Sequence, residues 1–237
     1  MTEPVTEPSS TSGIGSLGEG SLHAALKSWY ARPGDRLEAP VDGFVIDIVG
    51  DDRLVEIQTG HFTAIRPKLE RLLERHRLLL VHPIARERWI VRVTSEGEVL
   101  GRRKSPQRGR VEDVFRELVR LPHLLPHPHL SLEVALIQEE QVLVDDGRGS
   151  WRRQHWSLFD RRLLAVLETH RFATPADLAA LLPPDLPQPF SNRDLAAALA
   201  CRPDLAQKMT YSLQAMGALA RAGKRGRAGL FEAITST

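Results

Sequence analysis

The order of hydrophobic and polar residues between positions 21 and 57 predicts a helix followed by a β-hairpin. In residues 21–31, SLHAALKSWYA, the apolar side chains recur at helical spacing. Residues 35–40 form a short candidate strand. Two apolar runs, 44–49 and 53–57, then flank Gly50-Asp51-Asp52, and such a tripeptide between strands is typical of a hairpin turn.

The following pattern predicts a helix that returns the chain to the same sheet. Residues 61–76 carry apolar side chains at helical spacing and have a basic opposite surface. Residues 78–85, LLLVHPIA, form an unbroken apolar run that is typical of a strand buried on both faces. A helix between them acts as a right-handed crossover, which places strand 78–85 parallel to strand 53–57. We expect further strands over 89–93 and 98–100.

Beyond residue 110 the pattern changes twice. An amphipathic helix over 111–119 and a proline-rich connector over 122–129 precede two expected strands, 130–137 and 141–144. After residue 150 the chain becomes rich in Ala and Leu. There the pattern predicts four helices and a closing strand, over 157–170 or 160–170, then 176–182, 192–199, 205–222 and 230–234.

The length of 237 residues accommodates two domains that each bury a core. We expect a disordered tail over 1–20, which is rich in Ser, Thr, Gly, Pro and Glu, and domains over 21–150 and 151–237. No run approaches the roughly 18 apolar residues of a membrane span, and no signal peptide is visible. A single cysteine, Cys201, permits no internal disulfide, so the expectation is a cytoplasmic protein away from membranes.

The formal net charge of +2, from 32 basic and 30 acidic residues, does not by itself indicate a nucleic-acid partner. Local clusters of basic residues are a stronger indication of such a partner. The predicted helix 61–76 carries Arg66, Lys68 and Arg71, and the segment 102–110, RRKSPQRGR, begins with Arg102, Arg103 and Lys104. Such groups bind phosphate backbones. The alternative for the helix is a solvated face on which glutamates pair with the arginines.

Asp47 and Glu56 are the candidate catalytic pair. If Asp51-Asp52 is a two-residue turn, counting back along both strands places Asp47 directly opposite Glu56, with Cβ atoms about 4.5–5.5 Å apart. Two carboxylates that close repel unless a proton or a cation lies between them. A hard divalent cation prefers such oxygen ligands. The alternative is that acidic residues near a hairpin tip are simply solvated.

The αβββαβ order, with an Asp on one hairpin strand and Glu-x-Gln on the next, resembles the PD-(D/E)XK nuclease superfamily over about residues 21–93. The resemblance implies a restriction-endonuclease-like core within an α/β (α+β) fold. It also implies hydrolysis of phosphodiester bonds with Mg²⁺ (or Mn²⁺) and, as in many nucleases of this type, a homodimer. Carried over, Asp47 and Glu56 are the metal ligands, and Gln58 stands where a Lys is usual.

The same resemblance leaves alternatives open. Asp42, fourteen residues before Glu56, is a rival for the first ligand position, and either Glu19 or Glu38 is a weaker candidate for a further acidic residue. Gln58 can orient a water by hydrogen bonding but brings no positive charge. Some active members of the superfamily carry Gln there, whereas others have become binding modules.

The second unit resembles a winged helix over about 157–234, through two capped helices, a longer helix and a Gly/Arg-rich hairpin. If it contacts DNA, the longer helix presents Gln207, Lys208 and Tyr211 to the bases. Arg225 and Arg227 in the wing then meet phosphate. Winged helices also bind proteins, so a protein partner is the alternative.

These patterns lead to two function hypotheses. The first is a metal-dependent DNA endonuclease with a DNA-binding winged helix. The second is a catalytically inactive nuclease fold that acts as a DNA-binding or regulatory adaptor. No nucleotide-binding glycine pattern is present that would indicate a different class of enzyme.

Overall fold

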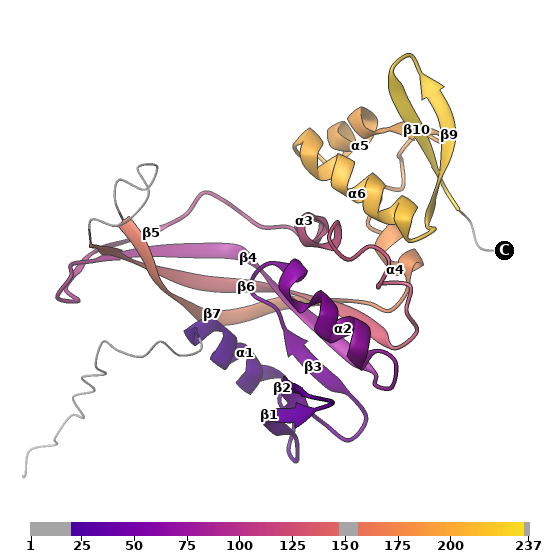
Figure 1. Ribbon diagram of the computed structural model, residues 1–237. Coiled ribbons are helices and arrows are strands. Elements are labelled where there is room, and N and C mark those ends of the chain that lie inside the picture. Colours follow the sequence, from indigo (N-terminus) through magenta and orange to yellow (C-terminus); the bar gives the residue numbers. More distant parts are fainter. Residues whose placement is uncertain (1–19, 147–155, 235–237) are drawn as a thin grey trace, which may run out of the picture.

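The structure is a computed structural model that describes residues 20–146 and 156–234, and it shows a mixed α+β fold built on one large sheet (Figure 1). The sheet strands are β1 (Arg36–Val41), β2 (Phe44–Val49), β3 (Leu54–Ile57), β4 (Leu78–Val93), β5 (Val99–Lys104), β6 (Leu130–Asp145) and β7 (Trp156–Phe172). The helices around it are α1 (Ser21–Tyr30), η1 (Phe62–Ile65), α2 (Arg66–Leu72), η2 (Val111–Val114) and α3 (Phe115–Leu118).

The sheet has the order β1-β2-β3-β4-β6-β7, with β5 added beside the far half of β4. Strands β1, β2 and β3 form an antiparallel meander, and β3, β4 and β6 are parallel. Strand β7 closes the other edge antiparallel to β6. The η1–α2 segment is therefore the predicted crossover, and it places β4 parallel to β3 as the sequence indicated.

The hairpin between β2 and β3 has the predicted register. Ile48 pairs with Val55 and Val49 with Leu54, and the Gly50 N–H donates to the Arg53 carbonyl at 3.0 Å. The same register places Asp47 opposite Glu56.

Helix α1 covers one face of the sheet. Its buried side chains pack on a small cluster that includes Val55, Ile57 and Val81. The Tyr30 hydroxyl donates to the buried Glu133 carboxylate of β6 at 2.7 Å. The other face carries α2, α3 and a larger cluster that continues into the C-terminal elements. The β2–β3 hairpin, which carries Asp47 and Glu56, thus lies between two packed helical layers.

Strands β4 and β6 are each sixteen residues long, whereas the sequence pattern predicted breaks at residues 86–88 and 139–140. A register shift between Ala85 and Glu87 absorbs the first irregularity. Glu139 continues β6 because Arg88 and Arg161 of the neighbouring strands pair with its carboxylate. Cross-strand ion pairs therefore keep polar residues inside a sheet that hydrophobicity alone would interrupt.

The helix expected to begin at residue 157 or 160 is wrong, because residues 156–172 form strand β7. Pairing with β6 along nearly its whole length overrides the local helical pattern. The expected domain boundary at residue 150 consequently falls between two strands of one sheet. The last sheet strand ends at Phe172, and the C-terminal elements begin only after it.

The C-terminal elements comprise three helices and a three-stranded sheet of order β8-β10-β9. They are α4 (Pro175–Ala179), β8 (Phe190–Ser191), α5 (Asn192–Ala198), α6 (Pro203–Ala215), β9 (Leu219–Arg225) and β10 (Ala228–Ala233). The predicted helix caps are confirmed: Thr174 and Ser191 each accept the N–H of an Asp three residues later. Helix α6 ends earlier than the expected residue 222, because Gly217 turns the chain at φ +78° into β9.

Two expectations concern residues away from these elements. The disordered tail was expected over 1–20, and all of it except Gly20 lies outside the described residues. Among the helices of the described ranges, none is long and apolar enough to cross a membrane.

Candidate functional site

The carboxylates of Asp47 and Glu56 lie where strands β2 and β3 stop pairing with each other. The last backbone pair is Ile48 with Val55. Beyond it the Asp47 side chain takes the place of a strand carbonyl, and its Oδ2 accepts the Ile57 N–H at 2.7 Å. The structure therefore places the first predicted residue against the chain segment that carries the second.

His23 of α1 completes this side of the site, and sequence reasoning missed it. Its Nε2 lies 3.1 Å from Asp47 Oδ2 and 3.0 Å from the Ile57 carbonyl oxygen. His23 is adjacent to the buried Leu22 on the helix, so its helical phase was visible in the sequence. What the sequence did not show was the position of α1 over the hairpin.

Lys68 occupies the other side of the site, against Glu56. Its ammonium group donates to Glu56 Oε1 at 2.6 Å and to the Val45 carbonyl at 2.6 Å. The side chains of Lys68 and Glu56 are only 16% and 8% exposed, so water screens this pair weakly. Glu56 Oε2 is buried and has no hydrogen-bond partner. Lys68 was predicted as a phosphate contact, and the structure brings it to the carboxylates instead.

The two carboxyl groups have pKa values that move in opposite directions. Burial, followed by the nearby Asp47 charge, raises the pKa of Glu56 above its ordinary value, although Lys68 opposes this. Burial also acts to raise the pKa of Asp47. The hydrogen bonds from His23 and from the Ile57 N–H nevertheless hold the Asp47 pKa below its usual range. Paired carboxyl groups with separated pKa values are typical of functional sites.

The remaining predicted site residues lie outside this arrangement. The Gln58 amide donates to the His61 carbonyl at 3.0 Å, which ties it to the loop after β3. Asp42 lies in the turn between β1 and β2 at φ +47°, and its Oδ2 is 2.9 Å from His76 Nε2. Glu38 pairs with Lys27, and Glu19 lies outside the described residues.

The site contains oxygen donors of the kind that a divalent cation prefers. Within residues 20–146 and 156–234, no group of three or more His, Cys, Asp or Glu side chains is placed to hold a metal. Mg²⁺ needs fewer, because it usually takes one or two carboxylates and completes its shell with water and phosphate oxygens. The unpartnered Glu56 Oε2, the Asp47 carboxylate and the Ile57 carbonyl oxygen supply hard ligands of that kind.

Most of the predicted phosphate-binding residues of the first unit already have acidic partners. On α2, Arg66 pairs with Glu70 at 2.8 Å and Arg71 with Glu74 at 3.1 Å. The first three residues of the basic segment 102–110 form the end of strand β5. There Arg102 lies over the Trp89 ring at 4.1 Å and pairs with a glutamate, Lys104 pairs with another, and Arg103 is exposed. Exposed ion pairs of this kind contribute little to stability.

The predicted contacts of the second unit lie on two of its surfaces. Gln207 and Tyr211 are exposed one turn apart on α6, and Lys208 is within 4.0 Å of Asp204. Arg225 of β9 donates to Asp194 at 2.6 Å, whereas Arg227 is exposed in the adjoining turn.

Residues 20–173 match the model of a family described as Domain of unknown function (DUF8091). The chain belongs to this family. The match begins one residue before α1 and ends one residue after β7, so the family domain contains the whole sheet and the candidate site. An "Uncharacterized protein" of Treponema pallidum (strain Nichols) is 36% identical over 184 residues, which cover 77% of this chain and 73% of that protein. No solved structure matches the chain.

Proposed function

We propose that this protein is a metal-dependent nuclease that hydrolyses phosphodiester bonds of DNA at Asp47 and Glu56. The observation that carries the proposal is the site between β2 and β3, where Glu56 lies opposite Asp47 in the strand register, pairs with the buried Lys68 and keeps one carboxylate oxygen without a partner. The element order and the parallel pairing of β3 with β4 also agree with a restriction-endonuclease-like core.

Each residue of the site has a role in this proposal. A divalent cation supplies positive charge at the scissile phosphate and lowers the pKa of a bound water. Asp47, Glu56 and the Ile57 carbonyl oxygen would hold that cation. Lys68 provides the positive charge that Gln58 cannot, because its ammonium lies 2.6 Å from Glu56. His23 orients Asp47 through its contact at 3.1 Å.

The C-terminal elements support a role in binding DNA. Their order of helices and strands resembles that of a winged helix, in which α6 would be the longer helix and β9–β10 the wing. Gln207 and Tyr211 on α6 are free to meet bases, and Arg227 is placed to meet phosphate.

The test is cleavage of plasmid and branched DNA with Mg²⁺ or Mn²⁺, comparing the full chain with Glu56→Gln. We expect cleavage that requires the divalent cation and falls in the variant to the level without metal. Glu70→Gln is the matched control, because Glu70 lies on the exposed surface of α2 and should leave the rate unchanged. Cleavage that persists in Glu56→Gln would contradict the assigned site.

One observation favours a second candidate function, a nuclease fold that binds DNA without cutting it. Lys68 pairs with Glu56 and His23 contacts Asp47, so each carboxylate already has a side-chain partner without a metal. DNA binding without cleavage under any divalent cation, by a chain that is shown to be folded, would favour this adaptor.

A further inference from the structure

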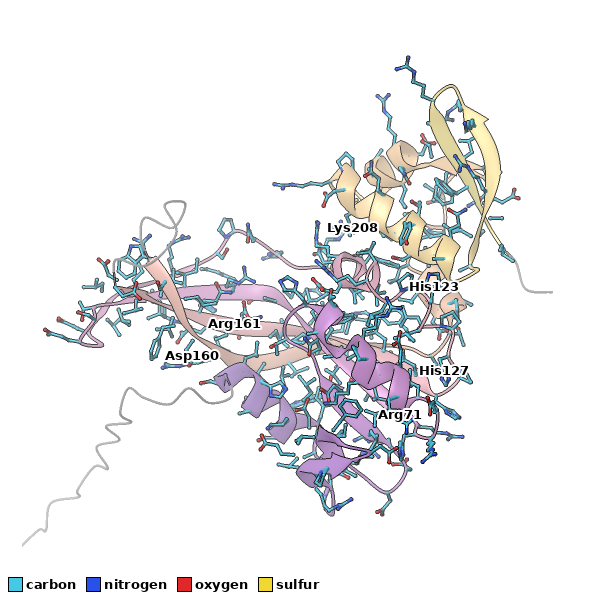
Figure 2. All side chains as sticks on the ribbon, viewed as in Figure 1. Arg71, His123, His127, Asp160, Arg161 and Lys208 are labelled. Atoms are coloured by element: carbon cyan, nitrogen blue, oxygen red, sulfur yellow. The ribbon has the colours of Figure 1, made fainter. Side chains whose placement is uncertain are left out.

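A pocket of about 230 Å³ opens beside the candidate site. The start of α1 and the loop after β3 form one side of it, and the start of β7 forms the other. Its lining residues are Gly20, Leu22, His23, Thr59, Leu158, Phe159, Asp160 and Arg161. Figure 2 shows Asp160 and Arg161 on β7 close to the beginning of α1.

The pocket and the candidate site share one residue, His23. This residue lines the pocket, and its Nε2 also contacts Asp47 Oδ2 and the Ile57 carbonyl oxygen. A group bound in the pocket therefore lies one side chain away from Asp47.

The walls of the pocket combine an apolar surface with fixed polar groups. Leu158 and Phe159 are 41% and 53% exposed, which leaves an aromatic ring open to solvent. Arg161 is held in place because its guanidinium donates twice to the fully buried Glu139, at 2.7 and 3.0 Å. Asp160 accepts the Ser21 hydroxyl at 2.8 Å, which joins β7 to α1.

We propose that this pocket binds one unpaired nucleobase of the DNA strand that lies in the candidate site. The substrate class is then single-stranded or locally unpaired DNA rather than a continuous duplex. This inference rests on the proposed function, because it names the substrate of that same site.

The size and chemistry of the pocket favour a single base. Its volume is below the roughly 300–1,000 Å³ of pockets for drug-sized ligands, so it accommodates one ring system. An exposed aromatic ring stacks on any base, since every base has a π-face. Beyond their bonds to Ser21, Arg162, Glu139 and the Thr59 carbonyl, the Asp160 carboxylate and the Arg161 guanidinium keep lone pairs and N–H groups for the edge of a base. A base that remains paired within a duplex cannot enter such a pocket.

The test measures binding by fluorescence anisotropy in EDTA, so that no cleavage occurs. The probes are a fluorescein-labelled 20-nucleotide oligothymidine and a labelled 20-base-pair duplex. We expect Phe159→Ala in the full chain to weaken binding of the single strand about tenfold or more. Binding of the duplex should change less than about twofold.

Leu167→Ala is the matched control, because Leu167 is 47% exposed on the same strand and does not line the pocket. It should change neither affinity, and thermal unfolding shows that both variants are folded. Equal effects of Phe159→Ala on both probes, or no effect on either, would overturn the pocket assignment alone. A wild-type chain that binds neither probe would instead overturn the proposed function.

Discussion

The ion pair between Lys68 and Glu56 determines the net charge of the candidate site as well as its packing. The pKa of Glu56 is raised even with Lys68 present, because burial and the nearby Asp47 charge disfavour the ionised carboxylate. A further positive charge nearby would stabilise the ionised form of Glu56. The burial that disfavours the ionised Glu56 therefore favours the binding of a cation beside it.

At the residue scale, we predict that Lys68→Met lowers the free energy of unfolding by about 1–3 kcal/mol near pH 7.5. Loss of the ammonium group raises the Glu56 pKa further in the folded state, whereas the unfolded glutamate ionises near its ordinary pKa of about 4.3. A group whose pKa is raised by folding stabilises the protein below its unfolded pKa and loses that contribution as pH rises. The loss should therefore be smaller at pH 5.

Urea denaturation at the two pH values measures this difference. Lys104→Met is the matched control, since Lys104 pairs with Glu87 on the exposed part of β5. It should have a much smaller effect that is similar at both pH values. A loss in Lys68→Met that is as large at pH 5 as at pH 7.5 would contradict the role assigned to Glu56.

At the element scale, the hairpin was predictable and the long strands were not. The turn residues and the alternation around residues 44–57 determine the register, and this register places Asp47 opposite Glu56. In contrast, β7 looks helical in isolation, and only its pairing with β6 makes it a strand. The contacts of His23 and Lys68 depend on how α1 and α2 pack on the hairpin, and this information is not local in sequence.

Glu139 joins three strands, because its buried carboxylate pairs with Arg88 of β4 and Arg161 of β7. We predict that Glu139→Ala lowers the free energy of unfolding by roughly 3 kcal/mol, since two arginines then lose a shared partner inside the sheet. The measurement is thermal or urea unfolding of the full chain.

Glu168→Ala serves as the control for this change. Glu168 also has two partners, Arg86 and His170, but its side chain is 47% exposed. Removal of an exposed pair should cost below about 1 kcal/mol. Equal losses in the two variants would show that burial of Glu139 does not strengthen its ion pairs.

At the scale of the whole molecule, the hydrophobic core does not stop where the family match stops. The larger buried cluster runs from α2 and α3 into the core of the C-terminal elements. Arg116 of α3 pairs with Asp204 at the start of α6, and Arg110 donates to the Leu199 carbonyl at 2.6 Å. The two units therefore share packing as well as polar contacts.

We predict that a chain ending at residue 173 is strongly destabilised relative to the full chain. Truncation uncovers the packed side chains of η2 and α3, among them Val114, Phe115 and Leu118. Exposure costs about 1.5–3 kcal/mol for each large apolar side chain, which approaches the whole stability of a typical domain. Thermal unfolding should show a much lower Tm or loss of the cooperative transition.

The control for truncation is Arg116→Ala, which removes the ion pair and leaves the apolar contacts in place. Because this pair is partly exposed, the variant should lose below about 1 kcal/mol. A truncated chain that unfolds at the same temperature as the full chain would show that the shared cluster contributes little.

The two-residue turn between β2 and β3 also restricts insertions and deletions in this part of the sequence. Side chains on a strand alternate between faces, so one codon inserted between Asp51 and Arg53 would shift the register by one residue. Glu56 would then point away from Lys68, and Val55 would take its place. Loops elsewhere tolerate insertions, whereas the eight-residue interval between Asp47 and Glu56 should stay constant among relatives that keep this site.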